Sequence, residues 1–255
     1  MNTVFTGTTV LIGGAVAVVL LGGAFGLTTR GSSASSKTLT DTLSEPRNGA
    51  SSARFDLNVG TGNLYIDTQV NSGTELASGT LQYAGKQGPP ARSLTMSSGK
   101  AVLTVRGDKT GRTGFRFPWE ACNGATDWQI HLNPAVAADL TAHSGGGNIK
   151  IDLSGMNVSS ISTDTGGGNI DLVLPDGAAN LLVTAQSGAG NVTVRAPRGA
   201  AIKVTAASGM GKIMVDPQIT QVDKTTFQSP GYDTAAQKIE LTLKSGAGNV
   251  TVVTQ

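Results

Sequence analysis

Several residue types are scarce in this chain of 255 residues. Aromatic residues make up 4% of it, charged residues make up 14%, and Cys122 is the single cysteine. One thiol cannot form an internal disulfide, and His131 and His143 alone could join it in a zinc site. The formal net charge of +2 is nearly balanced, so the composition does not indicate nucleic-acid binding. We therefore expect no metal, no cofactor and no nucleic-acid partner.

Catalytic motifs are scarce as well. The glycine-rich segments complete neither GxGxxG nor GxxxxGK[ST], and the chain has no GxSxG elbow. Three carboxylates, Asp152, Asp164 and Asp171, could in principle form an acid and base pair on one face. Asp152 and Asp171 fall at the outward positions of alternating segments, which are typical of solvated strand residues. The sequence therefore predicts no catalytic residues and no enzyme, with a glycan-active enzyme as the remote alternative.

An uncharged apolar segment follows a tail of residues 1–3. Residues 4–27 contain no charged side chain, and at about 1.5 Å per residue a helix of this length crosses a hydrocarbon core of about 30 Å. A cleaved signal peptide usually has a cationic start and a shorter apolar run, which favours a retained transmembrane helix. Residues 28–52, rich in Ser, Thr and Gly, are predicted to be a flexible linker.

These features predict a single-pass protein of the cell membrane. We expect the main domain to lie outside the cytoplasm. The nearest cations, Arg30 and Lys37, follow the predicted helix, and by charge bias alone they favour the opposite orientation.

A glycine-rich motif recurs through residues 53–255, with an irregular flank at 53–140 and regular repeats at 141–255. Its copies are GTGNLYI at 60–66, SGGGNIKI at 144–151, TGGGNIDL at 165–172, SGAGNVTV at 187–194, SGMGKIMV at 208–215 and SGAGNVTV at 245–252. The position after the last glycine of the motif recurs at 148, 169, 191 and 212, with spacings of 21 or 22 residues. A fixed period of this kind is typical of stacked repeats.

Each repeat predicts two short strands and two turns. Apolar and polar residues alternate after the motif, as in residues 149–152, which places one face in a core and the other in water. The glycines are expected to supply positive φ angles in a tight turn, where Asn is also tolerated. One repeat cannot bury its own apolar face, so neighbouring repeats must stack. The pattern alone does not distinguish a single sheet from a three-sided arrangement.

Two features of the flank invite functional interpretations. Trp119 and Trp128 are expected to cap one end of the stack, with a carbohydrate-stacking platform as the sharper alternative. The cations from Lys86 to Arg116 are opposed within that stretch by Asp108 alone. A solvated hairpin is the expected explanation, and a site for an anionic lipid or polymer is the alternative.

The motif copies and the segment from Lys238 to Val250 resemble bacterial toast-rack domains. Such domains occur in LiaF-like and PspC-like envelope-stress proteins and in related adhesins of the DUF4097 type. Residues 59–66 are similar to the start of LiaF-type domains. The resemblance covers about residues 50–255 and implies an all-β fold, a single-sheet twisted β-solenoid, with no catalytic residues to carry over. One predicted membrane helix, where LiaF-like and PspC-like proteins have several, argues against a direct regulatory role.

Together these observations predict a non-enzymatic, membrane-anchored interaction domain of the bacterial envelope. Envelope-stress sensing is a role that the resemblance implies. The expected partners are the membrane, bound through the N-terminal helix, and a protein or envelope polymer. The alternative is a surface adhesin or structural protein that self-associates through the ends of the solenoid, where Val250–Thr254 is expected to leave an unpaired strand.

Overall fold

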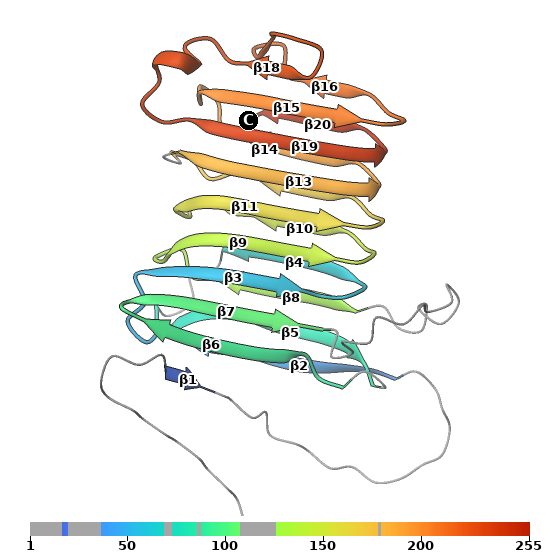
Figure 1. The fold of residues 1–255 in the computed structure, drawn as a ribbon. Coiled ribbons are helices and arrows are strands. Elements are labelled where there is room, and N and C mark those ends of the chain that lie inside the picture. The colour runs from blue at the N-terminus through green and yellow to red at the C-terminus, as the bar shows by residue number, and fades with distance from the viewer. Residues whose placement is uncertain (1–16, 20–36, 69–72, 86–87, 108–125, 178–179) are drawn as a thin grey trace, which may run out of the picture.

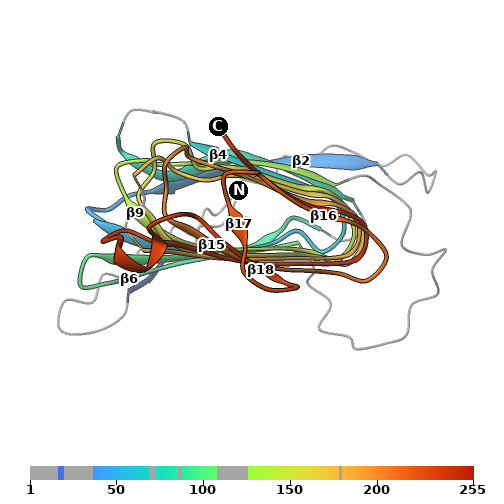
Figure 2. The same ribbon diagram turned by 90° about the horizontal axis from the view of Figure 1, so that it is seen from above.

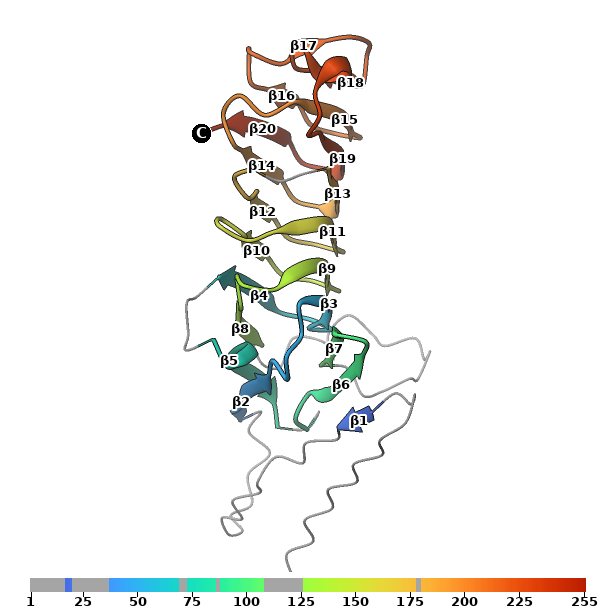
Figure 3. The same ribbon diagram turned by 90° about the vertical axis from the view of Figure 1, so that its left-hand side faces the viewer.

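The computed structural model describes residues 17–19, 37–68, 73–85, 88–107, 126–177 and 180–255. They form two β-sheets that face each other across a shared core, stacked along one long axis (Figures 1 and 3). Seen along that axis, the strands of successive repeats lie over one another in two layers (Figure 2).

Sheet A has eleven strands and sheet B has nine. In spatial order, sheet A comprises β1 (Ala17–Val19), β6 (Ala91–Ser97), β7 (Lys100–Arg106), β3 (Ser52–Asn58), β9 (Ala137–Ser144), β11 (Val158–Thr165), β13 (Leu181–Ala189), β19 (Ile239–Ala247), β15 (Ile202–Ser208), β18 (Thr226–Gln228) and β17 (Thr220–Gln221). Sheet B comprises β16 (Ile213–Val215), β20 (Val250–Thr254), β14 (Val192–Ala196), β12 (Ile170–Val173), β10 (Ile149–Asp152), β4 (Asn63–Thr68), β8 (Asp127–Leu132), β5 (Glu75–Ala84) and β2 (Thr38–Pro46). A short 3-10 helix, η2, spans Tyr232–Thr234.

Each repeat contributes one strand to each sheet, and we call such a pair, joined by its glycine turn, a rung. The rungs stack in parallel register, with Ile161 beside Val183 in sheet A and Ile170 beside Val192 in sheet B. The predicted all-β class is confirmed, but the structure has two sheets where the resemblance implied one. Strands on both sides of each turn carry an apolar face, and each face is buried only when another sheet lies opposite.

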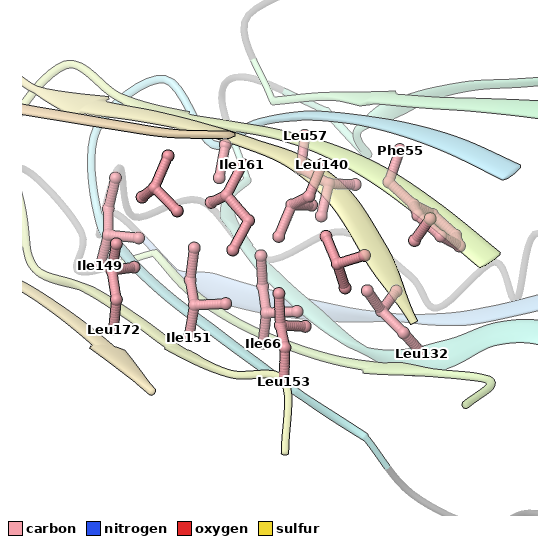
Figure 4. Close-up of a cluster of buried hydrophobic side chains, with 14 of the residues drawn as sticks. Phe55, Leu57, Ile66, Leu132, Leu140, Ile149, Ile151, Leu153, Ile161 and Leu172 are labelled. Carbon is pink, nitrogen blue, oxygen red and sulfur yellow. The ribbon is translucent and has the colours of Figure 1, made fainter. Parts of the chain in front are cut away.

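The core lies between the two sheets and is built from the inward residues of each strand. Side chains from sheet A, such as Phe55 and Ile161, meet side chains from sheet B, such as Ile151 and Leu172 (Figure 4). All four are at most 2% exposed. Burying one side chain of this kind contributes about 1.5–3 kcal/mol, so the alternation along the strands holds the two sheets together.

The first and last rungs are inserted between other rungs. In sheet A, β3 lies between β7 and β9, and β19 lies between β13 and β15. In sheet B, β20 pairs in parallel with both β14 and β16. The prediction that Val250–Thr254 leaves an unpaired strand is therefore wrong. The segment between β16 and β19 carries the chain back along the stack. The last rung, β19 and β20, therefore lies between the rung of β13 and β14 and the rung of β15 and β16.

Two differences from the sequence prediction concern the N-terminal part. The predicted linker, residues 28–52, contains β2, which pairs antiparallel with β5 over Thr38–Pro46. The predicted helix at 4–27 lies outside the described residues except for Ala17–Val19, which form β1. These three residues pair antiparallel with Leu94–Met96, where the free edge of β6 offers them backbone partners, so the helix prediction is wrong at these positions. Among the described residues, no helix is long and apolar enough to cross a membrane.

Candidate functional site along the glycine turns

The glycines of the motif are required by close contact between rungs. A Cβ on Gly168 would lie 2.1 Å from the carbonyl oxygen of Gly147, and one on Gly166 would lie 2.4 Å from that of Gly145. The glycine between them, Gly167, has open space at its Cβ position. Positive φ angles occur in only some copies of the motif, such as Gly147 at 145°. The prediction that the glycines are needed for positive φ therefore explains only some of them. Backbone proximity explains the rest.

The hydroxyl and amide groups of the motif connect each rung to its neighbour. Ser187 donates its hydroxyl hydrogen bond to the carbonyl oxygen of Gly168 at 2.8 Å. The backbone N–H of Asn191 donates to the side-chain oxygen of Asn169 at 2.9 Å. The same two contacts recur along the stack and fix the spacing between neighbouring turns. The turns thereby form one straight rigid edge.

An open hollow of about 650 Å³ lies over this edge on the sheet A side. It extends across five rungs and is lined by His143, Gly145, Asp164, Thr165, Gly166, Gln186, Ser187, Gly188, Ala207, Lys244, Ser245 and Gly246. The glycines form a floor without side chains. The lining residues lie at and just after the C-terminal ends of β9, β11, β13, β19 and β15, whose arrowheads point to the same side in Figure 1.

A row of outward side chains forms one wall of the hollow. The strand register places His143, Asp164, Gln186, Lys244 and Ala207 side by side on successive rungs. The imidazole Nδ1 of the first lies 2.5 Å from Oδ2 of the second. Within the described part of the chain, the Gln186 amide and the Lys244 ammonium have no hydrogen-bond or ion-pair partner, and both residues are exposed. The row therefore offers donors, acceptors and both signs of charge to a ligand.

The dimensions of the hollow suit a linear ligand. Neighbouring strands lie about 4.8 Å apart, so five rungs extend over about 19 Å along the stack axis. A ligand lying there crosses the strands at right angles and contacts side chains and turn backbone rather than pairing with a sheet edge. The hollow is thus longer along the stack axis than any one rung and lies open to solvent.

The three aspartates considered as catalytic candidates do not come together. Asp164 is on sheet A, whereas Asp152 and Asp171 are on sheet B. Asp152 accepts hydrogen bonds from the backbone N–H and hydroxyl of Ser154, and Asp171 forms an ion pair with Arg195. The described residues contain no group of three or more His, Cys, Asp or Glu side chains placed to hold a metal ion.

Other residues singled out from the sequence have structural partners. Trp128 is 1% exposed, and its indole N–H donates to the carbonyl oxygen of Gln82 at 3.1 Å, so it packs inside the core and offers no stacking platform. His131 Nδ1 lies 2.5 Å from Asp67. Cys122 and Trp119 lie outside the described residues.

The described cations of the basic stretch are opposed by acids from distant segments. Arg92 forms an ion pair with Asp41, and Arg106 lies 3.6 Å from Asp56. Lys100 is 3.8 Å from an Asp139 oxygen. The local sequence suggested an almost unopposed positive segment, but strand pairing brings carboxylates from other rungs beside it. The remaining cations of the stretch lie outside the described residues.

Sequence reasoning did not find the row beside the hollow, although a signal was present. Each of its members directly precedes the Ser or Thr that opens a motif copy, as Gln186 precedes Ser187. Aligning the repeats on their glycines would have shown a polar residue at this position in four copies. The alignment alone does not show that these polar residues form one continuous surface, because that depends on the rungs stacking in register.

The chain matches the profile of the N-terminal domain of toast-rack proteins, DUF2154, over residues 32–195. A solved structure described as a candidate cell adhesion protein from Clostridium sporogenes has a TM-score of 0.76 at 21% identity, covering 86% of this chain and 100% of that one. This likeness shows the fold alone. A candidate adhesin from Bacteroides fragilis is 14% identical over 86% of this chain and 98% of that one, and its TM-score of 0.31 carries no argument. No curated protein matches the chain.

Proposed function

Because the chain belongs to the toast-rack family, we propose that it is a non-enzymatic, adhesin-like interaction domain of the bacterial envelope. Its ligand is an extended, hydroxyl-rich glycan that lies in the hollow along the glycine turns. The observation that supports this most directly is the hollow itself, with its polar wall on successive rungs.

The chemistry of the hollow fits such a ligand. A floor of glycines lets a sugar ring approach the backbone closely. The His143–Asp164 pair, the Gln186 amide and the Lys244 ammonium present hydrogen-bonding groups that hydroxyl and acetamido groups can satisfy. A rigid stack presents them without reordering, which lowers the entropic cost of binding. No step in this function requires a bond to be made or broken.

Binding of glycan strands released from purified bacterial cell wall tests the proposal by isothermal titration calorimetry. A Gln186→Ala, Lys244→Ala double variant is expected to bind at least about tenfold more weakly, equivalent to about 1.4 kcal/mol. The matched control is Gln129→Ala, Lys150→Ala, which removes the same two residue types from exposed positions on the outer face of sheet B. Equal loss in both variants, or no binding by the wild-type chain, would rule out the hollow as this site.

Membrane anchoring through residues 4–27 is the finer part of the proposal, and it would require Ala17–Val19 to leave their pairing with β6. A β-domain held on a span outside the cytoplasm would reach envelope polymers, and an envelope-stress role would follow if occupancy of the hollow were transmitted to a membrane partner. A Ser36→Cys, Cys122→Ser variant treated with a membrane-impermeant maleimide on intact cells tests the orientation. Labelling supports an extracytoplasmic domain. Protection in intact cells with labelling after lysis contradicts it.

A further inference from the structure

Lys244 carries an uncompensated charge in the wall of the hollow. Of the other ionisable side chains of the row, His143 and Asp164 contact each other, with Nδ1 and Oδ2 2.5 Å apart. In the part of the chain that the structure describes, no carboxylate lies within ion-pair distance of the Lys244 ammonium. The row therefore contains one satisfied acid and one free cation.

The positions around Lys244 on the outer face of sheet A are uncharged. Strand register places Gln186 on one side of it and Ala207 on the other. Thr242 is the outward residue that precedes it on β19. The carboxylate of the wall lies two strands away, at about 10 Å, and at physiological salt charges are largely screened beyond about 8 Å. Lys244 thus acts as an isolated positive charge.

Other cations of the described chain differ from Lys244 in their surroundings. Lys203 lies on the same outer face of sheet A, but the register places it beside Glu240, and it does not line the hollow. Four further cations form ion pairs, and these are Arg92, Lys100, Arg106 and Arg195. The isolation of Lys244 is therefore a property of its place in the hollow rather than of the sheet.

The free polar groups beside the glycine floor at this point are mainly hydrogen-bond donors. The Lys244 ammonium has donors and no acceptor, and the Gln186 amide adds an NH₂ group. The two residues are neighbours in register, so their backbones are about 4.8 Å apart. The hydroxyls of Ser187 and Ser245 already donate to carbonyl oxygens of a neighbouring rung at 2.8 Å. A ligand group at this point must therefore accept hydrogen bonds, and a negative charge strengthens them.

We propose that the glycan in the hollow is acidic, and that a carboxylate of one of its sugars binds between the Lys244 ammonium and the Gln186 amide. One cation beside a neutral amide matches a singly charged group, which a carboxylate is at neutral pH. The His143–Asp164 pair then holds hydroxyl groups of the same chain farther along the wall. This proposal rests on the function proposed above, because it specifies the class of ligand for the same hollow.

Neutralising the carboxyl groups of the ligand tests the proposal. Glycan strands released from purified bacterial cell wall are treated with hydrofluoric acid, which removes phosphodiester-linked polymers and leaves carboxylates as the acidic groups. Half of the sample is then coupled to ethanolamine with a carbodiimide, which converts the carboxylates to neutral amides. We expect calorimetry to show that the full-length wild-type chain binds the neutralised strands at least about threefold more weakly than the acidic ones.

Two matched variants assign the effect to a side chain. Lys244→Gln removes the ammonium and keeps a polar side chain, so we expect it to bind both forms of the strands with the same, weaker affinity and to keep the wild-type melting temperature. The control, Lys203→Gln, removes an exposed lysine from the same face outside the hollow and should keep the preference for acidic strands. A preference that persists in Lys244→Gln, or that disappears in both variants, would overturn the assignment.

The outcomes for the wild-type chain separate this proposal from the function on which it rests. Equal binding of acidic and neutralised strands would refute the acidic ligand and leave a neutral glycan in the hollow. Binding of neither form would refute the glycan function itself, and this proposal with it. A preference for acidic strands that disappears in Lys244→Gln alone supports both.

Discussion

The side-chain oxygen of Asn148 accepts a hydrogen bond from the backbone N–H of Asn169 at 2.9 Å. The same hydrogen bond recurs along the stack: the side-chain oxygen of Asn169 accepts from the N–H of residue 191, that of residue 191 accepts from the N–H of residue 249, and that of residue 249 accepts from the N–H of Lys212. The ladder thus follows the spatial order of the rungs rather than their order in the chain. It ends at the one regular repeat copy that has lysine instead of asparagine, because no further rung follows it.

Replacing an asparagine inside this ladder should destabilise the fold. Asn169→Ala removes the acceptor for the Asn191 N–H, and we expect a loss of about 0.5–1.5 kcal/mol in the free energy of unfolding. Lys212→Ala at the ladder's end should change stability by less than about 0.5 kcal/mol. Chemical denaturation of both variants checks this. Equal changes in the free energy of unfolding would show that the asparagine hydrogen bonds do not stabilise the fold.

Neighbouring glycines in one turn should respond very differently to alanine. Gly168→Ala places a Cβ 2.1 Å from the Gly147 carbonyl oxygen, and we expect a loss of about 3 kcal/mol or more because two backbones must separate. Gly167→Ala meets no atom within 4 Å and should stay within about 0.5 kcal/mol of the wild type. Thermal unfolding followed by circular dichroism distinguishes them. A mild effect at position 168 would mean that the rungs can move apart.

Much of the fold could be predicted from the repeated motif. Its period, its alternation and the glycine turns predicted an all-β stack, and the basic stretch from Lys86 to Arg116 was expected to form a hairpin, which its described part does as β6 and β7. The rung order was not predictable, because identical motifs stack equally well in any order. Only the connection between Val215 and Ile239 decides which rung the last one joins. The hollow was missed for the same reason, since it depends on which rungs are neighbours.

Thr163 is a polar residue in the core without a hydrogen-bond partner. Its hydroxyl is buried and unpaired among the described residues, and the residue is 1% exposed. Thr163→Val keeps the shape and removes the desolvated hydroxyl, so we expect a gain of about 1 kcal/mol or more. The control is Thr165→Val, which removes the 2.9 Å hydrogen bond to the Gly147 carbonyl oxygen and should lose about 1–3 kcal/mol. Equilibrium unfolding of the pair gives both values. A loss at position 163 would indicate a partner for that hydroxyl.

Glu45 should make stability depend on pH. It is 2% exposed, and burial raises the pKa of its carboxyl above the ordinary 4.5, against the opposing effect of the Arg92 guanidinium. A folded-state pKa above the unfolded one means that the folded protein binds the proton more tightly. The stabilising contribution is therefore complete below pH 4.5 and is lost as the pH rises through the folded-state value.

The isosteric change Glu45→Gln tests this sign. The neutral amide carries no ionisation cost, so the variant should gain stability relative to the wild type as the pH rises from about 4 to about 7. Denaturant unfolding at several pH values within that range measures the difference. A difference that does not change with pH, or one that moves the other way, would contradict the assignment of burial as the dominant effect.

The interior position of the last rung makes the C-terminus essential to the stack. Odd-numbered residues near the start of β20 bond to β14, since the N–H of Val192 donates to the carbonyl oxygen of Asn249. Thr251→Pro therefore removes a ladder hydrogen bond inside a sheet, and we expect a loss on the order of 3 kcal/mol. Val215→Pro lies on the next strand, β16, but the N–H that it removes points away from β20. This change should therefore destabilise the fold far less. Comparing the two melting temperatures at low protein concentration checks the rung order. If the two prolines had equal effects, β20 would not lie between β14 and β16.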